Sequence, residues 1–403
     1  MDNILDVKDL SVQFSTHAGV LTAVRDASFF VKSGEVLAIV GESGSGKSVL
    51  TQSLVRLMPD PPCQIAGGEA WFEGKDLTKL TETELEGIRG KKISVIFQDA
   101  MTALNPTMKI GKQITEVILE HMNFNGKERS SFAEELVQAF AISGHKAIDK
   151  WLMEHFRMEQ DRIDQVRNKI IDMLGSQDAK PKVVEWIKKE GNITRQQAYD
   201  IAVSLLKLVK IPEAERRMGQ YIFQFSGGMR QRVMIAMALA CRPNLLIADE
   251  PTTALDVTIK SEVLELLISL IRELQTSIIL ITHDLGIVAS YADRIHVMYA
   301  GSFVEKGLAK DIFYNPQHPY TKGLLAAIPR LDLNAQEKLK NIEGVPPNML
   351  DTHKGCPFAP RCEYCMEVCL QVPPPETVLS ETQSASCWIL DPRAENARKA
   401  FHI

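Results

Sequence analysis

The chain has 403 residues, of which 45% are apolar and 24% are charged, a composition that is typical of globular proteins and excludes a fibrous or disordered one. Its formal net charge of −5 argues against a dominant nucleic-acid-binding surface, which usually carries a basic excess. No apolar run reaches the roughly 18–20 residues that span a bilayer, and the acidic segment 1–6 lacks the pattern of a signal peptide. We therefore expect a cytosolic protein of about two to three domains, which would need a spanning partner for any work at a membrane.

A phosphate-binding loop is predicted at residues 41–48. The apolar run 36–40 is predicted to be a buried strand, 41–48 fits the pattern G-x-x-x-x-G-K-[ST], and 49–55 is predicted to be a helix. The glycines let backbone N–H groups turn toward phosphate oxygens, and the helix adds the positive end of its dipole. Lys47 is expected to contact the β- and γ-phosphates of a nucleotide, and the Ser48 hydroxyl to ligate Mg²⁺. The predicted nucleotide contacts in this segment are Gly41, Ser43, Gly44, Ser45, Gly46, Lys47, Ser48 and Val49.

Residues 123–197 have the apolar spacing of helices and are not of low complexity. One apolar stripe recurs at helical spacing with charges opposite it, and a second, shorter helix follows. Thr194 and Gln197 form a predicted capping box that starts the next helix. Trp151 and Trp186 are expected in a core. The stripes consist of Ile163, Val166, Ile170 and Leu174, then Val183, Val184 and Ile187, then Ala198, Ile201, Leu205 and Leu208.

The sequence Ser226-Gly227-Gly228 precedes a predicted helix at 233–240. A serine and two glycines at a helix N-terminus make a second anion-binding end. One phosphate loop needs only one nucleotide, so this second end is useful if it caps the nucleotide of another subunit. An ordinary helix cap would explain the same residues.

Two carboxylates, Asp249 and Glu250, end a predicted apolar strand that begins at 244. Ligands of α/β sheets bind at the carboxyl ends of the strands. Asp249 suits the Mg²⁺ shell, and Glu250 suits polarisation of the attacking water. A solvated acidic strand end is the alternative, and the phosphate loop disfavours it.

The last part of the chain combines a hairpin with clustered cysteines. A hairpin with a glycine turn is predicted at 295–307. Five of the seven cysteines lie between 356 and 387, which in a cytosolic protein favours a metal or cluster site over disulfides. The spacings within Cys356, Cys362, Cys369 and Cys387 are wider than in usual zinc pairs. Thiolate sets also suit iron–sulfur clusters, Cys362-x-x-Cys365 is a plausible zinc pair, and reduced thiols packed as small hydrophobic groups are a further reading.

Taken in order, these motifs resemble those of ATP-binding-cassette (ABC) ATPases. Phe97-Gln98-Asp99 resembles the glutamine loop of that family, Ala254-Leu255-Asp256 the loop that crosses its dimer interface, and 279–284 its switch strand. The resemblance implies that Gln98 reaches Mg²⁺ and the attacking water and that His283 contacts the γ-phosphate. It also places Asp256 at the nucleotide site. Phe14 sits where the family has its adenine-stacking aromatic, although a lone phenylalanine is more often part of a core.

The resemblance implies an α/β fold of the P-loop NTPase class: a RecA-like core, an antiparallel β subdomain and a helical subdomain, followed by a cysteine-rich tail. It further implies a head-to-tail dimer, in which Ser226, Gly227 and Gly228 of one subunit close over the ATP held by Lys47 of the other. The chain's own contributions to both composite sites look competent. The expected parts are 1–100 (first part of the nucleotide-binding core), 101–232 (helical subdomain), 233–330 (second part of the core) and 331–403 (tail).

Two segments, 103–106 and 315–325, resemble the ATPase subunits of bacterial dipeptide and oligopeptide importers, and nickel importers share them. The match covers about 3–122 and 198–390. It implies as partners a second ABC ATPase, homologous and non-identical, two transmembrane permease subunits and an extracytoplasmic binding protein. The chain would then act as a peripheral subunit at the cytoplasmic face of the membrane, with peptides as the favoured solute and nickel or another small solute as the alternative. Importers with this cysteine pattern carry a [4Fe–4S] cluster, so the resemblance implies one on Cys356, Cys362, Cys369 and Cys387, with zinc as the alternative.

Other cassette types fit less well. A soluble cassette acting on ribosomes or DNA usually has two cassettes or long coiled coils, whereas this chain has one cassette, no sustained heptads and an acidic balance. An exporter cassette is disfavoured by the importer-type tail.

The chain departs from the family between Gln98 and Ser226. These residues are 128 positions apart, more than in relatives, so about 123–197 is expected to be an insert. This insert either lies near the contact with the membrane subunits or folds outward as an appendage, and a decoration without function is an equal reading.

Overall fold

The computed structural model describes residues 3–122, 133–134, 136–138, 140–141, 144, 148–149, 152, 160–176, 178–190, 193–252, 255–328, 342–350 and 354–401. The contacts divide the chain into two compact units, one of Met1–Asn105 with Phe225–Ile403 and the other of Pro106–Gln224. In the described part of the chain, no helix is long and apolar enough to cross a bilayer.

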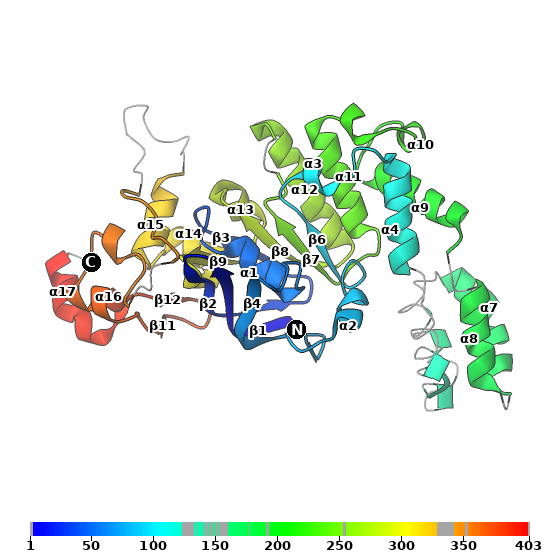
Figure 1. Cartoon of the computed structure of the whole chain (residues 1–403), viewed down its shortest axis with the longest axis horizontal. Helices are drawn as coiled ribbons and strands as arrows, with labels where there is room; N and C mark the ends of the chain where they lie inside the picture. Colours follow the sequence, from blue (N-terminus) through cyan, green and yellow to red (C-terminus); the bar gives the residue numbers. More distant parts are fainter. Residues whose placement is uncertain are drawn as a thin grey trace. The chain divides into compact units, whose positions relative to one another are not determined.

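The larger unit contains an eight-stranded sheet with the strand order β11-β12-β10-β9-β3-β8-β7-β6 (Figure 1). The strands β9, β3, β8, β7 and β6 run parallel, and β10, β12 and β11 continue the sheet antiparallel. Their bounds are β3 (Val36–Val40), β6 (Ile93–Ile96), β7 (Leu245–Asp249), β8 (Ser277–Thr282), β9 (Arg294–Tyr299), β10 (Ser302–Leu308), β11 (Glu376–Val378) and β12 (Ser384–Ser386). The predicted strand at 36–40 and the hairpin at 295–307 are confirmed. The strand predicted from 244 to Glu250 is confirmed as β7, which ends at Asp249, so Glu250 lies just after it.

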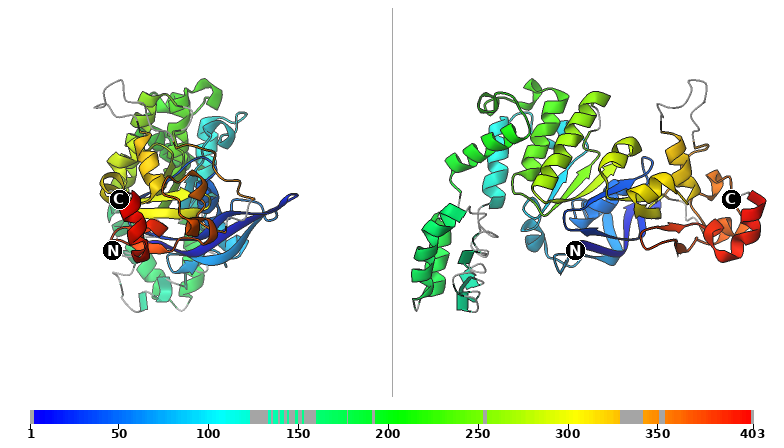
Figure 2. Two further views of the ribbon diagram at one scale, coloured as in Figure 1. Left: turned by 90° about the vertical axis from the view of Figure 1, so that its left-hand side faces the viewer. Right: turned by 180° about the vertical axis from the view of Figure 1, so that it is seen from behind.

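A four-stranded antiparallel sheet, in the order β2-β1-β4-β5, belongs to the same unit. Its strands are β1 (Asn3–Thr16), β2 (Gly19–Lys32), β4 (Cys63–Phe72) and β5 (Lys75–Asp76). Figure 2 shows the orange and red tail beside the blue strands of this sheet.

Alternation along the parallel strands gives the large sheet two apolar faces. Leu37 and Ile39 point to one face, which packs with the helix α1 (Lys47–Leu54) and the antiparallel sheet. Ala38 and Val40 point to the other, which packs with the helices after β8 and with Phe358 of the tail. This period of two is the pattern of strands buried on both sides. The remaining helices of the unit are α2 (Glu82–Glu86), α3 (Ala100–Ala103), α11 (Gly227–Leu239), α12 (Val257–Glu273), α13 (Leu285–Tyr291), α14 (Ala309–Tyr314) and α15 (Pro319–Ala326).

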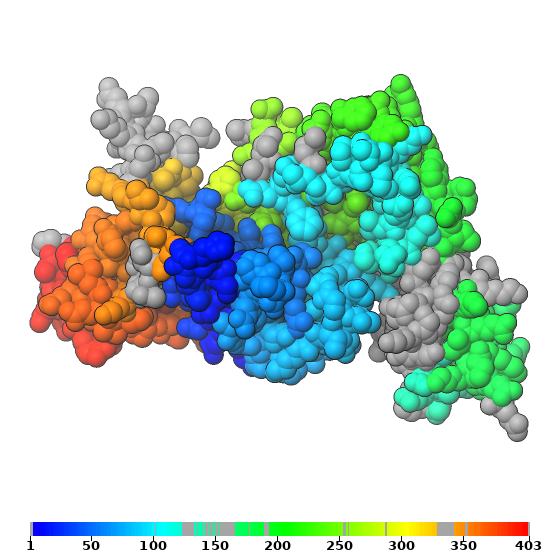
Figure 3. All heavy atoms as spheres, in the orientation of Figure 1, coloured from blue at the N-terminus to red at the C-terminus, as the bar shows by residue number. Residues whose placement is uncertain are grey.

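The tail shares the core of the larger unit. Its strands β12 and β11 extend the large sheet through β10, and Phe358 packs with Tyr299 and Tyr320. In Figure 3 the orange surface of the tail meets the blue surface of the first strands. Short helical segments complete it: η3 (Ala359–Arg361), α16 (Glu367–Gln371), η4 (Trp388–Leu390), η5 (Pro392–Ala394) and α17 (Glu395–Phe401).

The smaller unit is helical. The elements within its described residues are α4 (Ile110–Met122), α7 (Gln160–Leu174), α8 (Ala179–Glu190), α9 (Arg195–Leu208), α10 (Ala214–Arg217) and η2 (Ile222–Gln224). The predicted helices around 163–174, 183–187 and 198–208 are confirmed as α7, α8 and α9, and the capping box of Thr194 with Gln197 starts α9.

The expected insert has a hydrophobic cluster of its own. Its buried members, all between 133 and 187, include Ile170, Val183, Trp186 and Ile187. Trp186 is therefore in a core as predicted, while Trp151 and the side chain of Ile163 lie outside the described residues. The four-part division expected from the sequence remains a proposal beside the two units defined by contacts.

Candidate nucleotide-binding and active site

The phosphate loop connects β3 to α1 and takes a conformation that requires glycine. Gly41 has a φ of 154° and Gly46 a φ of 100°, and Gly46 is the N-cap of α1. A Cβ at Gly41 would lie 2.2 Å from the carbonyl oxygen of Met298, and one at Gly46 would lie 2.4 Å from that of Ala23. Backbone packs against the loop at both points, so no side chain fits there.

Lys47 and Ser48 point their polar atoms into the region predicted for phosphate and magnesium. The Lys47 ammonium donates to the carbonyl oxygens of Gly41 at 2.9 Å and Glu42 at 2.8 Å. The Ser48 hydroxyl donates to Asp249 Oδ1 at 2.9 Å, and Gln52 donates to Asp249 Oδ2 at 3.3 Å. The structure thus brings together the hydroxyl and carboxylate predicted as oxygen ligands, the kind that Mg²⁺ prefers.

Burial shapes the charges of this site. It lowers the pKa of Lys47, while the carboxylates Glu250, Asp249 and Glu42 act in the opposite direction. It raises the pKa of Asp249, against the hydrogen bonds from Ser48 and Gln52. A cation and anions that are poorly solvated interact more strongly with an incoming charged ligand than exposed ones do.

The Glu250 carboxylate is held by the two residues predicted to act with it. Gln98 Nε2 donates to Glu250 Oε2 at 3.0 Å, and His283 Nδ1 lies 3.2 Å from Oε1. These residues follow β6, β7 and β8, three neighbouring parallel strands. Glu250 itself has a φ of 45°, a conformation that side chains rarely adopt and that is frequent at functional sites.

The Ser226-Gly227-Gly228 segment starts α11. The Ser226 hydroxyl accepts a hydrogen bond from the Met229 N–H at 3.4 Å, so the helix-cap reading holds geometrically. A Cβ at Gly228 would lie 2.8 Å from Ile259 Cγ2, which shows that α12 packs closely on this end. Asp256 is the N-cap residue of α12 without a side-chain cap bond, and Ala254 lies outside the described residues.

Phe14 lies on β1, paired with Leu21 of β2 and Cys63 of β4. Its side chain is half-buried and packs against the hydrophobic cluster of this sheet. The core reading of Phe14 is consistent with this packing, and its stacking on adenine remains a prediction.

Three polar contacts to Glu42 were not predicted from the sequence. Its N–H donates to the Tyr320 hydroxyl at 2.8 Å, and its carboxylate accepts two hydrogen bonds from Arg361 at 2.7 and 3.0 Å. Both partners come from the segments around the tail, 278 and 319 positions away.

Comparison with known proteins gives the family. Residues 24–253 match the family described as ABC transporter, and residues 304–369 match the C-terminal region of oligopeptide/dipeptide transporters. The chain belongs to the ABC transporter ATP-binding proteins of the oligopeptide/dipeptide type. It is 44% identical to the dipeptide transport ATP-binding protein DppD of Bacillus subtilis, over 98% of each chain. It is 43% identical to the oligopeptide transport ATP-binding protein OppD of Escherichia coli, over 93% of this chain and 90% of the relative.

Among solved structures, this ABC protein is similar in fold to a dimeric ATP-binding cassette in a post-hydrolysis state bound to ADP and Pi. The TM-score is 0.52 at 21% identity, over 76% of this chain and 98% of the cassette. The likeness supports the predicted ABC ATPase fold, and about a quarter of this chain lies outside it.

The cysteines of the tail of this ABC protein lie in one region as free thiols. The pKa of Cys362 is raised to about 12, mainly by burial and in smaller part by the nearby Cys387, Cys356 and Cys369. Burial likewise raises the pKa of Cys356 to about 11 and of Cys387 to about 12. Within the described residues, however, no group of three or more His, Cys, Asp or Glu side chains is arranged to hold a metal ion. The donor chemistry fits a thiolate-bound metal or cluster, and the arrangement does not add support for one.

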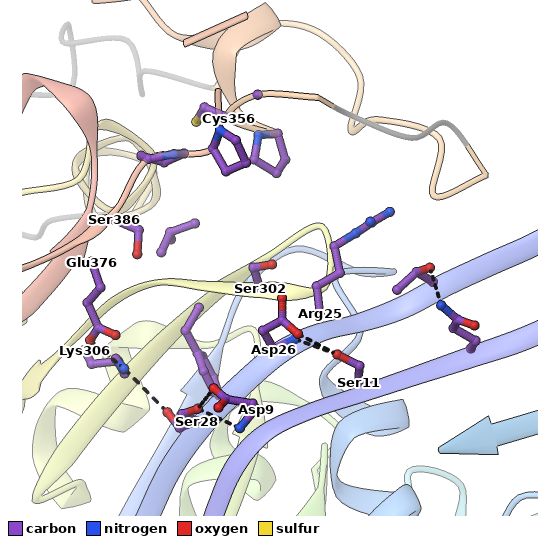
Figure 4. A pocket seen from close by; sticks show the side chains of 18 residues that line it. Asp9, Ser11, Arg25, Asp26, Ser28, Ser302, Lys306, Cys356, Glu376 and Ser386 are labelled. Carbon is purple, nitrogen blue, oxygen red and sulfur yellow. Dashed lines mark hydrogen bonds and ion pairs between the residues drawn. The ribbon is translucent and has the colours of Figure 1, made fainter. Parts of the chain in front are cut away.

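A separate hollow of about 610 Å³ lies between the antiparallel sheet, β10 and the tail (Figure 4). Figure 4 shows Arg25 rising from the sheet toward the tail, with Cys356 on the far wall. Asp9 accepts from Ser28 at 2.9 Å, as Asp26 does from Ser11. None of the described residues that line it was predicted to bind nucleotide, so it is distinct from the predicted ATP site.

Proposed function

We propose that this chain is the ATP-hydrolysing subunit that powers uptake of dipeptides or oligopeptides by an ABC importer. One observation carries the catalytic part: Gln98 and His283 hold the two oxygens of Glu250. Its similarity to DppD and OppD, named as peptide transport proteins, supports the solute class.

In this mechanism the loop at 41–48 binds the phosphates of ATP through its N–H groups and Lys47. Ser48 and Asp249 would hold Mg²⁺, and the ion would neutralise charge on the phosphates. Glu250 accepts a hydrogen bond from the attacking water and aligns it with the γ-phosphate, because Gln98 and His283 fix its orientation. Gln98 and His283 follow two different strands, β6 and β8, so the γ-phosphate end of the nucleotide is contacted from several elements.

The signature residues Ser226, Gly227 and Gly228 act in trans in this proposal. They close over the nucleotide of a second, homologous ATPase subunit in a head-to-tail dimer, with Asp256 at the interface. The dimeric state of the cassette of similar fold supports this assembly. Two transmembrane permease subunits and an extracytoplasmic binding protein complete the importer, and the chain is peripheral at the cytoplasmic face.

The test is the substitution Glu250→Gln in the assembled transporter. It keeps the shape of the side chain and removes its charge, so ATP hydrolysis and peptide uptake should both fall about 10²–10⁴-fold while ATP binding persists. Glu69→Gln, on the antiparallel sheet, is the control and should change neither. Hydrolysis and uptake that stay intact in Glu250→Gln would show that this mechanism is wrong.

We also propose that Cys356, Cys362, Cys369 and Cys387 hold a [4Fe–4S] cluster that pins the tail, with Cys365 outside it. Protein purified without oxygen should contain about four iron atoms per chain and absorb in the visible cluster band. Cys362→Ser should lose both signals, and Cys241→Ser, a buried cysteine far along the chain, should keep them. Stoichiometric zinc would instead identify a zinc site. If the protein contains neither iron nor zinc, the cysteines are reduced thiols packed in the tail.

A further inference from the structure

Glu42 is the point at which the tail region reaches the phosphate loop. It is the second residue of the loop, and its N–H, its carboxylate and its carbonyl oxygen are each bound. The first two are bound by Tyr320 and Arg361, and the third accepts from Lys47 at 2.8 Å. A single residue, Glu42, therefore links the tail to the Lys47 ammonium, because it contacts both.

Arg361 is fixed on all sides. Its guanidinium donates to both carboxylate oxygens of Glu42, to the Tyr299 hydroxyl at 3.2 Å, and to the carbonyl oxygens of Glu343 at 2.9 Å and Ile342 at 3.3 Å. Its side chain is only 5% exposed. A two-pronged pair of this kind sets position as well as charge, because both N–H···O bonds must be aligned at once.

An aromatic cluster holds the tail at this point. Phe358, three residues before Arg361, packs on Tyr299 at a centroid distance of 5.3 Å and on Tyr320 at 5.4 Å. Tyr320 is fully buried, and its hydroxyl is the acceptor for the Glu42 N–H. Arg361 thus sits on a packed platform and on a short turn at 359–361, flanked by Cys356 and Cys362.

The pair also matters for charge. Glu42 is a carboxylate beside a site that must receive a polyphosphate, and without a cation it would repel that ligand. Arg361 neutralises it at 2.7 Å in a half-buried position, where water screens charge poorly. Removing Arg361 alone would leave this carboxylate unpaired next to the loop. An unpaired, partly buried charge has a larger free-energy penalty than the loss of both partners.

We propose that Arg361 is a positioning residue of the nucleotide site: through Glu42 it holds the phosphate loop and Lys47 in place and cancels the charge of Glu42, so the tail sets the affinity for ATP. This rests on the proposed function, because it takes the loop at 41–48 as the ATP site. Arg361 touches no reacting atom. We therefore expect its removal to lower ATP affinity and to leave the rate of the chemical step nearly unchanged.

The experiment compares Arg361→Gln, Glu42→Gln and the double variant. ATP affinity is measured by calorimetry on the full chain, and kcat and KM for ATP in the assembled transporter. Arg361→Gln should weaken ATP binding about tenfold and raise KM similarly, with kcat within about threefold of wild type. The double variant should recover the part of the lost affinity that comes from the unpaired carboxylate, and the part that comes from the lost positioning of the loop should persist.

Two further variants keep the test decisive. Tyr320→Phe removes only the acceptor of the Glu42 N–H and should weaken ATP about threefold, which serves if Arg361→Gln does not fold. Glu376→Gln breaks the ion pair with Lys306, 2.6 Å long, which also ties the tail to the core but does not involve the loop. It should leave ATP affinity unchanged.

The outcomes separate cleanly. Wild-type affinity in Arg361→Gln and in Tyr320→Phe, or an equal loss in Glu376→Gln, would overturn the positioning role. No recovery in the double variant would overturn the charge-cancelling role. A wild-type chain that binds no ATP would instead overturn the proposed function itself.

Discussion

Lys47 is a cation that is 5% exposed and surrounded by backbone carbonyls and three nearby carboxylates. An ammonium group in this setting is held in place by oxygen atoms before any ligand arrives. Gly41 and Gly46 let the carbonyl oxygens of Met298 and Ala23 pack directly against the loop, because they carry no side chain at these points. The backbone conformation of the loop and the position of the Lys47 charge are therefore fixed together.

The substitution Gly46→Ala tests this shape. Its Cβ would lie 2.4 Å from the Ala23 carbonyl oxygen at a φ of 100°, so the free energy of unfolding should fall by about 2–5 kcal/mol and ATP affinity should fall with it. Gly34→Ala is the matched control: its φ is 73°, but a Cβ there has nothing within 4 Å. Gly34→Ala should lower the free energy of unfolding by about 1–2 kcal/mol and leave ATP affinity unchanged. Denaturant unfolding and calorimetry check both, and equal effects from the two variants would contradict the prediction.

At this scale the sequence predicted the residues that follow one another in a motif. Lys47, Ser48, Asp249 and Glu250 were predicted because short segments carry them, and the structure brings Ser48 to Asp249. The pair of Glu42 and Arg361 could not be predicted, because Glu42 is a variable position of the loop pattern and its partner is 319 residues away. The packing of Phe358, three residues before Arg361, on Tyr299 helps to bring that arginine to the loop.

Among the elements, α15 lies in the segment 315–325, which was identified by resemblance, and it positions Tyr320 against the phosphate loop. His318 is its N-cap: the ring nitrogen Nδ1 accepts from the Tyr320 N–H at 3.1 Å, and the His318 N–H donates to the buried Glu305 at 2.9 Å. The cap fixes the first turn of the helix and with it the hydroxyl of Tyr320, which meets Glu42.

His318 should make the stability of the protein depend on pH. Burial lowers the pKa of His318 to about 3, below the usual value of 6.5. Between these values the unfolded chain binds a proton and the folded chain does not, so stability is complete above about pH 6.5 and is lost as the pH falls. At pH 5 the loss from this group is about 2 kcal/mol.

The measurement is denaturant unfolding at pH 7 and pH 5. His318→Asn keeps a capping side chain that does not titrate, so its loss of stability between the two pH values should be smaller than that of wild type by about 2 kcal/mol. His17→Asn, in an exposed turn, is the control and should behave as wild type does. An unchanged pH dependence in His318→Asn would refute the assignment.

The elements themselves were predicted where their pattern is local. The stripe from Val166 to Leu174 gave α7, and the capping box at Thr194 gave the start of α9. The three-residue strands β11 and β12 were not predicted, because a strand so short has too few residues to show alternation and exists only by pairing with β10.

At the scale of the whole molecule, the described residues of 133–187 form a hydrophobic cluster separate from the two clusters described for the larger unit. Folding energy from burial is shared only among side chains that touch. A loss in this cluster should therefore stay local, as is expected of a cooperative unit with its own core.

The substitution Trp186→Ala tests that independence. It removes a large buried side chain and should cost the cluster about 3–5 kcal/mol. Amide hydrogen exchange should rise in α7 and α8 and stay unchanged in β3 and α1, and ATP affinity should match wild type. Phe72→Ala, in the cluster of the antiparallel sheet, should give the reverse pattern: amide exchange should become faster in β1 and β4 and stay unchanged in α7. If Trp186→Ala also speeds exchange in β3, the insert is energetically part of the nucleotide-binding core, and the ATPase could not have acquired or lost it without changing its own stability.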